Sequence, residues 1–165
     1  MTRIMGIDLS SRKIAIVVLD PEAEPRAHTI TVKKQPSRAD ELYELETGLY
    51  GYFPMMHPCW VYIEAPVVGR GGARPTVLQS QVDGVVQVAT VRFGHLGTYS
   101  VNNKTWKKAV VGNGNAAKDD TRSWLAAHHP VLADLCGDDQ DLVDAAGVAL
   151  YGTGVIERAR RLKLT

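Results

Sequence analysis

A chain of 165 residues with 45% hydrophobic and 22% charged residues is typical of one globular domain with a full core. No apolar run approaches the roughly 20 residues of a membrane span, and the first residues lack the basic start and apolar core of a signal peptide. Cys59 and Cys136 stand alone, which favours a reducing cytosol over a disulfide scaffold. The net charge of +1 predicts no partner, so nucleic-acid binding has to come from local clusters of charge.

The order of the predicted elements indicates an α/β fold with a mixed sheet and helices on its faces. In chain order they are strands at 3–8, 13–19 and 28–33, a helix at 38–50, a strand at 60–64, a loop at 67–75, a helix at 76–93, a strand at 98–101, a short turn near 104–110, a helix at 118–128 and a long helix at about 139–161. The first three strands are expected to form an antiparallel meander. Ser37 is placed to cap the first helix, and Pro54 and Pro58 to end it.

Acidic side chains end two apolar strands and open the last helix. Asp8 follows Met-Gly-Ile, and Glu64 follows Val-Tyr-Ile. Asp141 and Asp144 lie three residues apart on one helical face. The small residues at 145–147 would let that helix lie close against the sheet. The sequence therefore predicts that four carboxylates meet, provided that the two strands are neighbours.

Four carboxylates in an apolar setting would repel one another and raise each other's proton affinity. A divalent cation removes that repulsion, and Mg²⁺ prefers oxygen ligands while keeping waters that phosphate oxygens can replace. Two such ions roughly 4 Å apart can activate a water and stabilise the leaving oxygen of a phosphodiester. The pattern thus favours a two-metal phosphodiesterase site.

Each acidic residue also has a simpler interpretation. Asp8 could cap the turn through Ser10 or Ser11, and Glu64 could be a solvated strand end. The acids that open the last helix could merely favour the positive end of its dipole. The combination of all three features favours a shared site over three separate local roles.

Basic residues gather in two loops that suit contact with phosphates. The segment NNKTWKKAVVGNGNAAKDDTR at 102–122 carries five of them: Lys104, Lys107, Lys108, Lys118 and Arg122. The loop directly after Glu64 carries Arg70 and Arg74. A solvated surface is the alternative interpretation of these cations. Trp106, within the first segment, is expected in the core rather than in a stacking role.

Four segments together resemble the RuvC-type Holliday junction resolvases over most of the chain. They are GIDLSS, YIEAP, VNNKTWKKAVVGNGNAAK and DLVDAAGVALYG, in this order and at these separations. The resemblance implies a ribonuclease H-like fold with a five-stranded mixed sheet and helices on both faces, as one nuclease domain over 1–165. It also implies a homodimer that cuts four-way DNA junctions with magnesium or manganese, in the cytoplasm of a bacterial cell or a phage-infected host.

The same resemblance implies roles for particular residues. The metal-binding residues, for two ions per active site, would be Asp8, Glu64, Asp141 and Asp144. Lys107 and Lys118 match the family's basic residues near the scissile strand. The helix at 76–93 matches the one that builds the family's dimer interface.

The sequence departs from the family after Glu64, where bacterial members place an aromatic wedge that opens the junction. Here the residues are Ala-Pro-Val-Val at 65–68, a divergence expected of a phage-type member. The alternatives to a junction resolvase are a nuclease that acts mainly on flaps, forks or R-loops, and a junction-binding protein without catalysis. An actin-like phosphotransferase also begins with a Gly-Ile-Asp strand, but that fold needs two domains and a longer chain.

Overall fold

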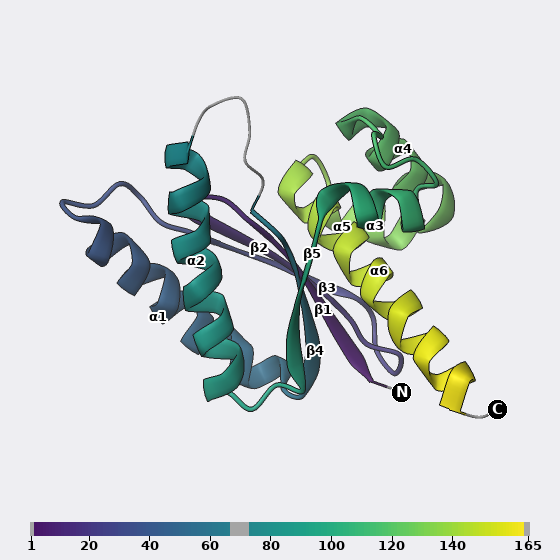
Figure 1. The fold of residues 1–165 in the computed structure, drawn as a ribbon, viewed down its shortest axis with the longest axis horizontal. Helices are drawn as coiled ribbons and strands as arrows, with labels where there is room; N and C mark the ends of the chain where they lie inside the picture. The colour runs from purple at the N-terminus through teal and green to yellow at the C-terminus, as the bar shows by residue number, and fades with distance from the viewer. Residues whose placement is uncertain (1, 67–72, 164–165) are drawn as a thin grey trace.

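Two groups of helices enclose one mixed sheet in the computed structural model, which describes residues 2–66 and 73–163 (Figure 1). The strands are β1 (Arg3–Leu9), β2 (Lys13–Leu19), β3 (Arg26–Thr31), β4 (Cys59–Glu64) and β5 (Gly97–Val101). The helices are α1 (Arg38–Met56), α2 (Ala73–Arg92), α3 (Asn103–Val110), α4 (Lys118–His128), α5 (Pro130–Cys136) and α6 (Gln140–Lys163). The expected five-stranded mixed sheet with helices on both faces is confirmed. Within the described ranges, no helix is both long and apolar enough to cross a membrane.

The strand order β3-β2-β1-β4-β5 places the first strand at the centre of the sheet. β1, β2 and β3 form the expected antiparallel meander, whereas β1, β4 and β5 run parallel. Ile7 pairs with Ile63 in the β1–β4 ladder, so the next residue on each strand is acidic, namely Asp8 and Glu64. The condition on which the acidic site depended, that these two strands are neighbours, is therefore met.

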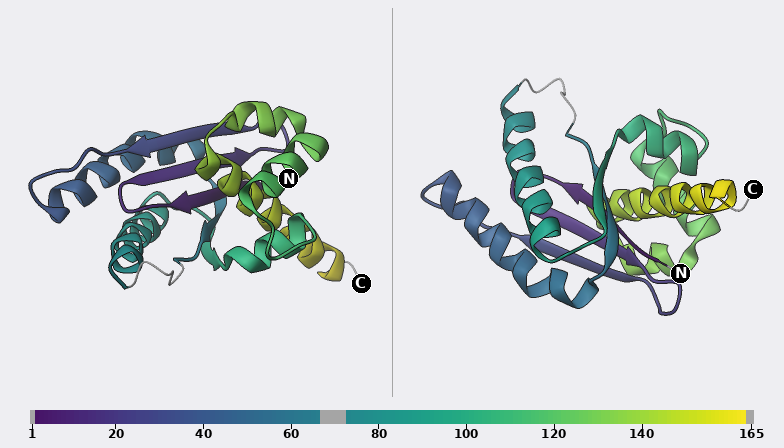
Figure 2. Two further views of the ribbon diagram at one scale, coloured as in Figure 1. Left: turned by 90° about the horizontal axis from the view of Figure 1, so that it is seen from above. Right: turned by 60° about the horizontal axis from the view of Figure 1, so that its bottom comes forward.

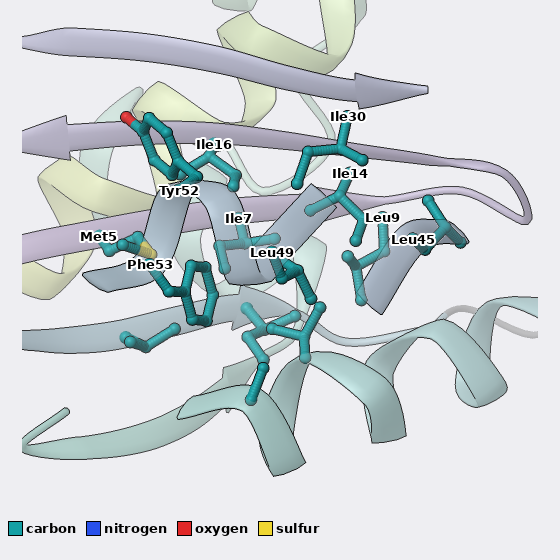
Figure 3. Packing of buried hydrophobic residues seen from close by; sticks show 14 of the residues in the cluster. Met5, Ile7, Leu9, Ile14, Ile16, Ile30, Leu45, Leu49, Tyr52 and Phe53 are labelled. Atoms are coloured by element: carbon teal, nitrogen blue, oxygen red, sulfur yellow. The ribbon is translucent and has the colours of Figure 1, made fainter. Parts of the chain in front are cut away.

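Strand alternation decides which face of the sheet the two acids share, because successive side chains point to opposite faces. One face packs against α1 and α2 through a buried cluster (Figure 3) that includes Met5, Ile7, Leu9, Ile14, Ile16, Leu45, Leu49 and Phe53. Ile4 and Tyr62 belong to a second cluster, formed with α3 to α6 on the other face (Figure 2). Asp8 and Glu64 share the alternation of Ile4 and Tyr62, so their side chains emerge on the α6 face.

Small residues let α6 lie close against that face, as the sequence predicts. A Cβ added at Gly6 in β1 would meet the backbone of Ala145 and Ala149 in α6. A Cβ added at Gly147 would meet the ring of Trp106. This close approach brings the amino-terminal turn of α6, with its acids, to the end of β1.

Two helix boundaries differ from those expected. Pro54 is predicted to end α1, yet the helix continues to Met56. A proline in the last turn removes one backbone hydrogen bond, and the burial of Phe53 and Met56 offsets that loss. α2 begins at Ala73, so Arg74 lies in its first turn and not in the preceding loop. The Ser37 cap is confirmed, since its side chain accepts a hydrogen bond from the backbone N–H of Asp40.

Two further elements were not expected in their observed form. α3 is a regular helix where the sequence suggests a short turn, and it begins at a cap in which the Asn102 side chain accepts the N–H of Lys104. α5 follows Pro130 and was not predicted. Its seven residues are too few for a hydrophobic period to stand out from the flanking helices.

Candidate active site

Asp8 lies at the carboxyl end of the central strand, where its Oδ1 accepts the backbone N–H of Leu9 at 2.9 Å. Burial raises the pKa of the Asp8 carboxyl to about 8, and repulsion from Glu64, Asp144 and Asp141 adds to the increase. Each of the other three candidate acids therefore raises the pKa of Asp8. The fold brings all four into one electrostatic neighbourhood.

Glu64 is buried, with 8% of its surface exposed, and both of its carboxylate oxygens accept hydrogen bonds. Asn103 Nδ2 donates to Oε1 at 2.8 Å, and the indole Nε1 of Trp106 donates to Oε2 at 2.7 Å. Both donors come from the start of α3. Trp106 is fully buried, so its expected place in the core is confirmed, and its ring also orients the acid.

Asp141 and Asp144 lie in the first turns of α6 and have different surroundings. Asp141 forms an ion pair with Lys13 at 2.7 Å between Oδ2 and Nζ. Asp144 Oδ1 accepts a hydrogen bond from Gln140 at 3.1 Å. Burial raises the pKa of Asp144 to about 6, and repulsion from Glu64 contributes. The two acids on α6 thus face the strand-end acids from the opposite side of the site.

The chemistry of this donor set suits a divalent cation that prefers oxygen ligands, because four carboxylates converge and two of them have raised pKa values. Their positions in the structure are looser than a coordination shell. Within residues 2–66 and 73–163, no three acidic, histidine or cysteine side chains form a group that could hold a metal ion. Protein donors hold the carboxylates of Glu64 and Asp141 instead.

The two lysines expected near the scissile strand both act on Asp144, since each lowers its pKa. Lys107 is buried, and its Nζ donates to the backbone oxygen of Ala116 at 3.1 Å. Lys118 is exposed at the first position of α4. One lysine is therefore fixed beside the acids, and the other is free to meet a ligand from solvent.

The remaining basic residues have diverse environments. Lys104 and Lys108 are exposed on α3. Arg122 forms an ion pair with Asp138 at 3.1 Å and donates to its backbone oxygen, which ties α4 to the segment before α6. Arg74 lines a hollow of about 510 Å³ together with Leu9 and other residues at the end of β1. Arg70 lies outside the described residues, as do Val67 and Val68 after the strand-end glutamate.

Lys13 and Asn103 contact the candidate acids, although no sequence pattern marks either residue. Lys13 opens β2 and lies 128 residues from Asp141 along the chain. Asn103 lies in the basic segment but carries no charge. A polar residue at a strand or helix start is common, so no local signal distinguishes these two from solvated residues.

No family model matches the chain, but relatives and solved structures do. The crossover junction endodeoxyribonuclease RuvC of Cereibacter sphaeroides is 28% identical over 98% of this chain and 95% of its own length. That of Xylella fastidiosa is 29% identical over 98% and 94%. A structure of Thermus thermophilus RuvC in complex with Holliday junction substrate superimposes with a TM-score of 0.75 at 18% identity, covering 92% of each chain.

The sequence similarity extends over nearly the whole length of both relatives, and the solved structure shares the ribonuclease H-like fold. The motifs that suggested the resemblance lie at the carboxyl ends of β1 and β4, at α3 and at the start of α6. These are the elements that bring the four acids together. The chain is therefore similar, over nearly its whole length, to crossover junction endodeoxyribonucleases of the RuvC type, as its motifs suggest.

Proposed function

We propose that this chain resolves Holliday junctions by metal-dependent hydrolysis of phosphodiester bonds, with Asp8, Glu64, Asp141 and Asp144 as its metal ligands. One observation carries the proposal: the pKa of Asp8 rises to about 8 because it is buried beside the other three acids. A protein gains nothing from such repulsion unless a cation relieves it. The fold maintains this arrangement with three separate stretches of chain.

The protein's own residues provide a rigid frame for the reaction. Asp8 lies on the central strand, and Glu64 is held by two donors from α3. A pair of Mg²⁺ or Mn²⁺ ions bound there would supply an activated water and charge stabilisation at the leaving oxygen. Lys107 and Lys118, which both lower the pKa of Asp144, would position the strand or stabilise the extra negative charge of the transition state.

Exposed cations beside the acids suit the backbone of a branched DNA. Lys104 and Lys108 on α3 and Arg74 on α2 lie on elements that flank the carboxyl ends of β1 and β4. The Thermus protein, which shares this fold, has a structure in complex with Holliday junction substrate. Phosphate contacts of this kind position the duplex without reading its sequence.

A homodimer through the helix at 76–93 completes the proposal. α2 buries Val82, Val86 and Ala89 against the sheet. It exposes Val77, Val88 and Val91 to solvent by 53%, 55% and 80%. Apolar side chains exposed in this way suit contact with a second copy. Each subunit would then present one site, so that paired nicks fall on opposing strands.

Cleavage of a labelled four-way junction tests the proposal. The protein should nick with Mg²⁺ or Mn²⁺ and stop with EDTA, and Asp8→Asn should bind the junction without cutting it. Full cutting by Asp8→Asn, or by the wild type in EDTA, would overturn the assignment. Junction binding without nicks at any metal concentration would identify a non-catalytic binder. A parallel panel of flaps, forks and R-loops measures which branched substrate is cut fastest.

A further inference from the structure

Lys13 connects two acids at the start of α6. Its ammonium lies 2.7 Å from Asp139 Oδ1 and 2.9 Å from Asp139 Oδ2, and 2.7 Å from Asp141 Oδ2. The exposed fraction of the side chain is 24% for Lys13, 31% for Asp139 and 36% for Asp141, so solvent partly screens these ion pairs. We name this contact between Lys13, Asp139 and Asp141 the Lys13 bridge.

We propose that Lys13 is a counter-cation built into the active site, which holds Asp141 when no divalent ion is bound and competes with that ion for the carboxylate. The inference rests on the proposed function, because it takes Asp141 as a metal ligand. Lys13 is thus a positioning residue. It acts on the reaction through Asp141 and sets how readily the site takes up metal.

Asp139 gives the ammonium a place to remain when Asp141 is released. The Asp139 carboxylate accepts the backbone N–H of Asp141 at 3.1 Å, and its backbone oxygen accepts the N–H of Val143. Asp139 is therefore fixed as a cap at the start of α6. Because both of its oxygens lie within hydrogen-bond distance of Lys13, the lysine keeps a full ion pair after Asp141 turns away.

The bridge also affects how a divalent ion can enter the acidic cluster. One acid of the set, Asp141, is already neutralised by a residue of β2. A divalent ion has to displace that ammonium before Asp141 can coordinate it. Removing the ammonium leaves the cluster one charge more negative, so a cation should bind more tightly.

The test is titration of Mn²⁺ into the DNA-free protein. Calorimetry and the electron paramagnetic resonance signal of free Mn²⁺ measure how much of the ion is bound. Lys13→Gln should bind Mn²⁺ about two- to fivefold more tightly than the wild type, the range expected for losing one partly exposed competing ion pair. Lys13→Arg, which keeps the cation, should restore the wild-type affinity. Unchanged or weaker Mn²⁺ binding by Lys13→Gln would overturn the inference, since a purely structural lysine predicts weaker binding.

Arg158→Gln is the matched control. It removes one positive charge from an exposed position on α6, the helix that carries Asp141. The two residues are about 25 Å apart along the helix, at 1.5 Å per residue. At that distance the charge is screened, so affinity should not change. A gain equal to that of Lys13→Gln would mean that net charge, and not the Lys13 bridge, sets the affinity.

Two further results separate this inference from the proposed function. If Asp8→Asn abolishes Mn²⁺ binding while Lys13→Gln leaves it unchanged, the metal site stands and the inference about Lys13 fails. If the wild type binds no Mn²⁺, both fail. Should Lys13→Gln not fold, the ammonium resonance of Lys13 in the wild type gives the answer, because Mg²⁺ should shift it and increase its exchange with water. An unchanged resonance at saturating Mg²⁺ would overturn the inference.

Discussion

Replacing Asp8 by asparagine should abolish nicking and yet stabilise the metal-free protein. Burial and repulsion from Glu64, Asp144 and Asp141 raise the pKa of Asp8 from 3.8 to about 8 in the fold. The folded protein therefore binds more protons than the unfolded chain between about pH 4 and pH 8. Its stability is highest below that window and falls as pH rises through it. Asp144, with a pKa raised to about 6, adds to the loss in the lower half of the window.

The size of the effect follows from the pKa of Asp8. Each pKa unit corresponds to about 1.4 kcal/mol, so the change from 3.8 to about 8 sets an upper limit of about 5 to 6 kcal/mol above pH 8. The neighbouring acids can protonate in turn and share this cost, so we expect about 2 to 3 kcal/mol from Asp8 itself. Asparagine carries no charge and keeps an oxygen for the N–H of Leu9. For a chain of this size, the gain raises the Tm by about 4 to 12 °C.

Thermal unfolding in EDTA at about pH 5 and about pH 9 measures this gain. The wild type should lose stability between the two conditions, and Asp8→Asn should lose less, so that the variant is the more stable protein at the higher pH. Asp134→Asn, at an exposed position in α5, should follow the wild type at both. Mg²⁺ should then raise the Tm of the wild type and not that of Asp8→Asn. An Asp8→Asn protein no more stable than the wild type at about pH 9 would refute the reasoning.

Three other expectations concern packing, orientation and DNA contact. Gly6→Ala should lower the free energy of unfolding, measured in urea, by at least about 2 kcal/mol, because the new Cβ would meet the α6 backbone. Gly84→Ala, whose Cβ would meet nothing within 4 Å, should leave that free energy unchanged or raise it by up to about 1 kcal/mol, and equal effects of the two variants would contradict the close approach of α6. Trp106→Phe removes the indole donor to Glu64, so the rate of junction nicking should fall about tenfold and the free energy of unfolding by about 1.5 to 3 kcal/mol. Unchanged nicking would show that the indole does not orient Glu64 for the reaction. Lys104→Ala and Lys108→Ala should each reduce the slope of log affinity against log salt by about 1, measured by anisotropy of a labelled junction, and an unchanged slope would place that lysine outside the interface.

The strands and the convergence of their acids could be predicted because both depend on local pattern. Apolar runs that end in a carboxylate mark β1 and β4, and small residues at 145–147 mark a helix that packs closely. Strand alternation then places both strand-end acids on the α6 face without further information. The parallel pairing of β1 with β4 required the structure, since the order of elements alone allows several topologies.

The partners of the acids could not be predicted, because they come from positions far apart in the chain. Lys13 lies 126 residues before Asp139, and Asn103 lies 39 residues after Glu64. Nothing in the sequence around Lys13 separates it from a solvated lysine at the start of a strand. The continuation of α1 past Pro54 could not be predicted either, because it depends on the packing of Phe53 in the buried cluster between helix and sheet.

The segment at 102–122 both shapes the candidate site and contacts one of its acids. The indole of Trp106 holds Glu64, and Lys107 donates to the backbone of Ala116 on the far side of the glycine loop. A Cβ at Gly114 would lie 2.9 Å from the backbone oxygen of Lys104, so the loop closes tightly against α3. That closure delivers the start of α4, with its exposed lysine, to the side of Asp144. A change of loop length here should therefore move the lysine at the start of α4 relative to Asp144.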